Sequence, residues 1–170
     1  MPRGWLKNIE TIVQKGEEKV REAERARLKR EEERRKKIND VKGVIKSCLN
    51  DVIELLQKYD VKGSIIEDDE TILLKMPDLS EVNRANLLFE IACTPEKTSW
   101  KVGVTAFKID AETPNILSGL RPEEDIEGFV ARVTEEFLEG WYKRKLSDEL
   151  NKEREWQLKI SSQPLTGKGE

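Results

Sequence analysis

The side chains that could carry out chemistry are carboxylates, amines and two thiols, because the sequence contains no histidine. Histidine is the commonest general base and a frequent zinc ligand, so its absence removes Ser–His and Cys–His nucleophile pairs. Asp, Glu and Lys occur along the whole chain, and no spacing marks out a catalytic pair. We therefore expect a protein that is not an enzyme and that holds no metal ion and no cofactor.

Two segments contain residue types found in cation-binding or phosphate-binding loops, but neither has the sequence pattern of such a loop. Residues 67–70 (EDDE) could attract a divalent cation, but they do not match an EF-hand loop and are typical of a solvated turn. Residues 166–169 (TGKG) resemble a fragment of a phosphate-binding loop, but no strand is predicted before them and no helix after them. Cys48 and Cys93 are isolated among apolar residues, which favours reduced core thiols in a cytoplasmic protein over a disulfide bond between them.

Charge is abundant and unevenly distributed along the chain. Residues 1–62 contain 17 Lys and Arg against 12 Asp and Glu, a net charge of +5, and the remainder contains 14 against 22, a net charge of −8. A basic arm on an acidic body favours partner choice by charge or head-to-tail self-association. The sequence shows no signal peptide and no apolar run of about 18 residues, so we expect a cytoplasmic protein without a membrane span.

One stretch, roughly residues 8–59, is predicted to form a single long helix around which the rest of the chain is arranged. It contains no proline, and Gly16 and Gly43 are the only points at which the helix is expected to be weak. Residues 17–37 are almost all charged, with several acids four residues before a base, which is typical of a solvated helical stalk. A helix of about 50 residues is about 75 Å long. Because a domain of this size is narrower than that, we expect the helix to project or to pair with another chain.

The second half of this helix, from residue 38, is amphipathic. Its apolar residues recur at steps of three and four, and further apolar residues widen the stripe beyond what a two-stranded coiled coil needs. We expect this half to pack on the sheet or C-terminal helix of its own chain, with a second copy as an additional partner. The recurring positions are Ile38, Val41, Ile45, Cys48, Val52, Leu55 and Tyr59.

Four segments after the helix have the alternation typical of strands, and they predict an antiparallel meander with one face covered by helix. Gly63 is expected to end the first helix in a left-handed conformation, and residues 112–121 to form a loop because they contain Pro114 and Gly119. A phase slip in the fourth segment suggests a bulge near residues 105–106. The predicted strands are residues 64–67, 71–76, 87–94 and 99–110.

A second helix is expected from Pro122, at a favourable first helical position, to about Trp156. The predicted fold class is therefore α+β, with a long N-terminal helix, a four-stranded meander and a long C-terminal helix packed on the sheet. Residues 1–37 would form an apolar tip and charged stalk, residues 38–158 a compact domain and residues 159–170 a disordered tail. The predicted buried stripe of the second helix is Ile126, Phe129, Val130, Val133, Phe137, Trp141, Leu146 and Leu150.

Apolar residues also recur at helical spacing at the very start of the chain, at Trp5, Leu6, Ile9, Ile12 and Val13. They could pack on their own domain or a dimer mate, dock in the groove of a partner, or lie at a membrane interface. We favour docking, because apolar faces lie at both ends of the long helix with none between. The expected function is that of a non-enzymatic adaptor or assembly subunit, whose partner is another protein or a second copy in a homodimer.

The alternative is a nucleic-acid-binding regulatory protein that uses the basic part of the long helix. Three consecutive acids at residues 31–33 lie within this basic run and would repel phosphate, and no aromatic residue is interleaved to stack on bases. The interaction function is therefore preferred. The basic residues are Lys29, Arg30, Arg34, Arg35, Lys36 and Lys37.

Overall fold

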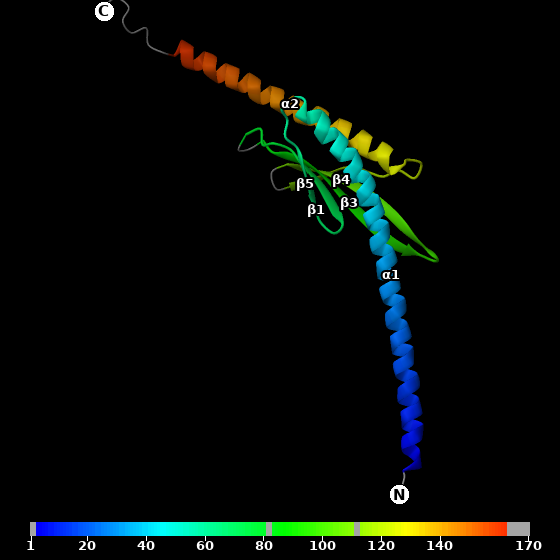
Figure 1. Ribbon diagram of the computed structural model, residues 1–170. Coiled ribbons are helices and arrows are strands. Elements are labelled where there is room, and N and C mark those ends of the chain that lie inside the picture. The colour runs from blue at the N-terminus through cyan, green and yellow to red at the C-terminus, as the bar shows by residue number, and fades with distance from the viewer. Residues whose placement is uncertain (1–2, 81–82, 111–112, 163–170) are drawn as a thin grey trace, which may run out of the picture.

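The computed structural model describes residues 3–80, 83–110 and 113–162, which form two long helices and a five-stranded antiparallel sheet (Figure 1). This arrangement confirms the α+β class, with five strands in place of the four expected. The strands follow one another in the sheet in the order of the sequence. In chain order the elements are α1 (Gly4–Gln57), β1 (Ser64–Glu67), β2 (Thr71–Lys75), β3 (Ala85–Glu96), β4 (Ser99–Asp110), β5 (Thr113–Gly119) and α2 (Ile126–Ser161).

Helix α1 runs for 54 residues without interruption, so neither Gly16 nor Gly43 breaks it. It ends where Asp60 adopts a positive φ of 59° and the Val61 amide donates to the Leu56 carbonyl, 3.1 Å away. This is the geometry of a left-handed helix terminus. The expectation that Gly63 would take this role is wrong, because an Asp side chain also tolerates the left-handed region and comes earlier in the chain.

Strand β5 occupies residues that were expected to form a loop. Its position at the edge of the sheet explains how it accommodates Pro114, whose missing amide hydrogen matters little where one side of the strand has no neighbour. Strand β4 itself pairs with β3 without a break. A register shift does occur close to the predicted position, between Ala106 and Phe107, but it lies in the pairing of β4 with β5, where Leu117 of β5 is the extra residue. Phe107 therefore does not return to the face of Val104, and the predicted bulge belongs to β5.

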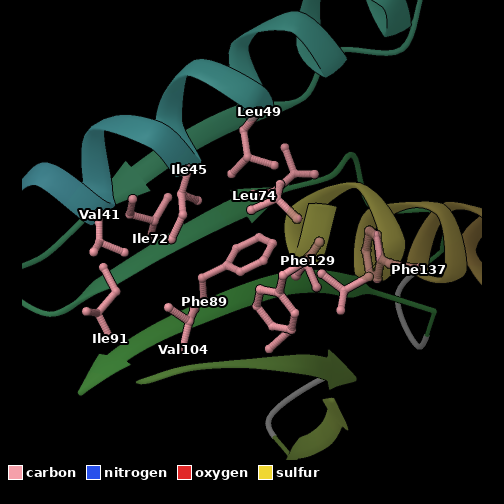
Figure 2. Close-up of a cluster of buried hydrophobic side chains, with 14 of the residues drawn as sticks. Val41, Ile45, Leu49, Ile72, Leu74, Phe89, Ile91, Val104, Phe129 and Phe137 are labelled. Carbon is pink, nitrogen blue, oxygen red and sulfur yellow. The ribbon is translucent and has the colours of Figure 1, made fainter. Parts of the chain in front are cut away.

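The core lies between one face of the sheet and a layer made by the second half of α1 and the first half of α2 (Figures 1 and 2). Leu49 and Leu56, which belong to the residues expected to widen the stripe, are buried in it. Leu55 and Tyr59 are exposed, which corrects their assignment to the heptad seam. A helix that packs on a sheet keeps its own 3.6-residue period, so a strict seven-residue spacing rotates out of the contact. Side chains that meet in this core include Val41, Ile45, Ile72, Leu74, Phe89, Ile91, Val104, Phe129 and Phe137.

Helix α2 begins at Ile126, four residues after the expected start. Asp125 precedes it as the N-cap, and its carboxylate accepts a hydrogen bond of 2.7 Å from the amide of Gly128. With the helix starting at Ile126, the Gly128 amide is one of the first four, which have no carbonyl partner within the helix, and the Asp125 side chain supplies one.

The C-terminal end of α2 extends past the edge of the sheet (Figure 1). Leu146 and Leu150 are 60% and 57% exposed there, so their assignment to the buried stripe is wrong, because no sheet lies beneath this part of the helix. The helix continues to Ser161, beyond the predicted end at Trp156. Residues 163–170 of the expected tail lie outside the described residues.

Candidate docking site on the N-terminal helix

The five apolar residues predicted to dock lie in the first three turns of α1, at the end farthest from the sheet (Figure 1). At 100° per residue their side chains span an arc of about 120° of the helix surface. We call this surface, made by Trp5, Leu6, Ile9, Ile12 and Val13, the tip face. All five side chains are exposed, from 46% for Ile9 to 69% for Ile12.

The tip face cannot pack on its own domain in this conformation. Ile9 and Ile38 are 29 residues apart on a continuous helix, which corresponds to about 44 Å. The helix therefore separates the apolar tip face from the apolar face that enters the core. Five large apolar side chains gathered on one exposed helix face are typical of a surface that another molecule covers.

Ion pairs attach α1 to the β1–β2 turn at the point where the helix leaves the core. Arg34 Nη2 lies 2.5 Å from Glu70 Oε1, and the same guanidinium group donates through Nε to the carbonyl of Cys93 at 3.3 Å. A weaker contact of 3.5 Å joins Arg34 to Glu31 within the helix. Arg34 thus connects α1 to two separate parts of the sheet at the point where the stalk begins.

Lys42 makes the second attachment and is almost fully buried, with 6% of its surface exposed. Its ammonium group donates to the Asp68 carbonyl at 2.6 Å and lies 2.9 Å from the Glu67 carboxylate. Lys46 contacts the same carboxylate at 2.8 Å. Hydrogen bonds from Lys42 and Lys46 lower the pKa of Glu67 to about 2, so this carboxylate is ionised at neutral pH.

The acidic run at residues 67–70 is therefore not only a solvated turn. Glu67 and Glu70 pair with cations of α1, and the backbone carbonyl of Asp68 accepts from Lys42. Three carboxylates or thiols placed to hold a metal ion occur nowhere in the described residues. Lys42 lies on the buried stripe, between Ile38 and Ile45, and that spacing was the sequence signal for its burial.

The six basic residues of the alternative function do not form one surface. Arg34 is engaged by Glu70 and Glu31, and the other five are exposed. At 100° per residue they point to all sides of the helix, and the three glutamates between them do the same. The geometry therefore gives no continuous basic strip for a phosphate backbone.

Cys48 and Cys93 are both free thiols, so the disulfide bond between them is not present. Within the described ranges, no helix combines the length and the apolar composition that crossing a bilayer requires. Comparison of the chain with protein-family models, with curated proteins and with solved structures finds no match.

Proposed function

We propose that the protein is a non-enzymatic interaction protein that presents the tip face to a protein partner at a fixed distance from its folded body. The observation that carries this proposal is the uninterrupted helix α1, which is anchored in the core at one end and exposes five large apolar side chains at the other. Such a helix docks by laying its apolar face into a groove of the partner.

The charged stalk between the two ends acts as a spacer in this proposal. It has no apolar stripe to draw it onto a surface, and its strong helix formers, with acids placed four residues before bases in the sequence, favour a helix in water. The body supports the stalk and provides surfaces for self-association. Full burial of a Leu or Ile side chain is worth about 1.5–3 kcal/mol before the costs of association are subtracted, so five large apolar side chains can act as an anchor.

Capture of a partner from cell extract by the purified full chain tests this function. The double variant Trp5→Ala, Ile9→Ala should lose capture. It should keep the melting temperature of the wild type when both are compared at a concentration at which the wild type is monomeric, because both side chains are exposed and support no core. Val20→Ala combined with Leu28→Ala is the matched control, since these residues are also exposed on the stalk, 52% and 63%, but lie outside the tip face. Capture that survives the tip variant, or a large loss of stability in it, would contradict the proposal.

A further inference from the structure

A groove with a volume of 340 Å³ lies between α1 and α2 on the solvent side of the helical layer. Val130 and Thr134 of α2 are buried at its base, and Cys48 and Val52 of α1 are partly buried beside them. Its wall is mostly apolar, and the charged residues that line it are all acidic. These rim carboxylates are Asp51, Glu127 and Glu135.

One polar atom at the base of the groove has no partner. The Thr134 hydroxyl is fully buried, the residue is only 4% exposed, and no described group forms a hydrogen bond with this oxygen. A buried hydroxyl without a partner costs about 1–3 kcal/mol. A ligand that covers the apolar wall gains from its burial, and only a ligand that brings a polar group to this oxygen would also relieve the cost.

We propose that this groove receives the tip face of a second copy of the chain. The inference rests on the proposed docking function and names the partner surface. Apolar residues on one side meet an apolar wall on the other, and the charges are complementary. Residues 3–15 have a net charge of +2, from Arg3, Lys7 and Lys15 against Glu10, and these side chains lie beside and behind the tip face. The groove has three acids and no Lys or Arg in its lining, so the two segments attract each other through their net charge.

The lengths of the two surfaces agree as well. Residues 5–13 of the tip face extend for about 12 Å along the helix axis, and the part of α1 that lines the groove, residues 48–55, extends for about 10 Å. One helix of this length can therefore lie along the groove between α1 and α2, as a third helix of the layer.

A chain cannot fill its own groove, because the tip face and the groove lie on the same uninterrupted helix. Ile9 and Asp51 are 42 residues apart on α1, a separation of about 63 Å. Two copies whose α1 helices run antiparallel bring each tip to the groove of the other, so one symmetric dimer fills both grooves.

Disulfide trapping between the tip and Cys48 tests the pairing directly. In the full-length variant Ile9→Cys, mild oxidation should produce an adduct of twice the 19.7 kDa chain mass, with position 9 of one chain joined to Cys48 of the other. Burial, together with Glu127 and Asp51, raises the pKa of the Cys48 thiol, so the oxidation is carried out above neutral pH. The adduct should disappear when Cys48→Ser is added.

Glu24→Cys is the matched control, because it places a thiol on the same exposed helix outside the tip face. Equal trapping at this position, or no trapping at position 9, would overturn the proposal.

Light scattering supplies a second measurement, of the mass of the particle in solution. The wild type should have twice the chain mass, and Ala131→Arg, which places a bulky cation on the groove lining, should return it to the monomer. Ser147→Arg, an exposed site of α2 outside the groove, should leave the dimer intact.

The outcomes separate this inference from the proposed function. If Trp5→Ala with Ile9→Ala abolishes capture of another protein, and position 9 is not trapped by Cys48, the groove pairing is wrong and the docking function stands. If the tip variant changes neither capture nor mass, both are wrong.

Discussion

Lys42 shows how a single side chain joins the long helix to the sheet. A buried ammonium group is costly unless its hydrogen bonds are made, and Lys42 finds a carbonyl and a carboxylate on the β1–β2 turn. The β1–β2 turn is stabilised by the same contacts, because its carboxylates Glu67 and Glu70 pair with cations of α1. The attachment is electrostatic and local, so it should respond to pH.

Replacement of Glu67 by Gln tests this response. The pKa of Glu67 is lowered from 4.5 to about 2 by Lys42 and Lys46, so its ionised form stabilises the folded state. That stability is fully present above pH 4.5 and is lost as the pH falls towards 2. We therefore expect Glu67→Gln to melt below the wild type at pH 7, and the two melting curves to converge as the pH approaches 2.

The control is Glu90→Gln, since Glu90 is an exposed carboxylate of β3 outside the ion pairs of the described residues. Its melting temperature should follow that of the wild type at every pH. A difference between Glu67→Gln and the wild type that stays constant from pH 7 to pH 2 would show that the ion pairs do not stabilise the fold.

At the scale of the elements, the spacing of apolar residues in the sequence predicted the regular helices and most of the strands. The two helices and strands β1 to β4 follow from apolar residues at helical or alternating spacing. Strand β5 was missed because Pro114 and Gly119 are turn residues by composition, and only the edge position of the strand makes them acceptable. The tip face could also be predicted from the sequence, because its apolar residues recur at helical spacing within one segment. The groove could not, since its two sides come from residues about 80 positions apart.

Two glycines in helices should respond oppositely to substitution. Gly43 has open space where a Cβ atom would lie, so Gly43→Ala should stabilise the protein by about 0.5–1 kcal/mol through helix propensity. A Cβ atom at Gly128 would lie 2.7 Å from the Asp125 carboxylate that caps α2. Gly128→Ala should therefore displace the cap and cancel the gain, since a lost cap costs about 1 kcal/mol. Denaturant unfolding of both variants measures the difference, and equal stabilisation would contradict the role of the cap.

The two halves of α2 should also differ in their contribution to stability. Phe137 is 2% exposed and packs in the core, so Phe137→Ala should cost about 3–5 kcal/mol. Leu150 is 57% exposed beyond the sheet, and Leu150→Ala should change stability by about 0.5 kcal/mol or less. Urea unfolding of the two variants is the measurement. A large cost at Leu150 would place the end of α2 in a contact that the monomer lacks.

At the scale of the whole molecule, the helices give the chain an unusually large surface. Its accessible area is 13,054 Å², whereas a compact monomer of the same mass exposes about 8,600 Å². The free ends of α1 and α2 contribute to this excess, because they extend in different directions from the body (Figure 1). Little of their surface is buried within one chain.

Small-angle X-ray scattering on the Ala131→Arg variant, which we expect to be monomeric, tests this shape. A compact chain of 170 residues has a radius of gyration of about 15.5 Å. We expect a value well above this, with a distance distribution that has a long tail, because α1 projects far beyond the sheet. A value near 15.5 Å would mean that the helix folds back onto the body.

A helix anchored at one end is also a lever arm. From Arg34 to Trp5 the stalk measures about 44 Å, so a tilt of about 5° at the ion pairs moves the tip by about 4 Å. That displacement approaches the rise of one helical turn, enough to shift the tip face from one set of contacts to the next. Small changes in how the second half of α1 packs on the sheet are thereby magnified at the far end, and the core beneath Ile38 and Val41 limits where the apolar end can reach.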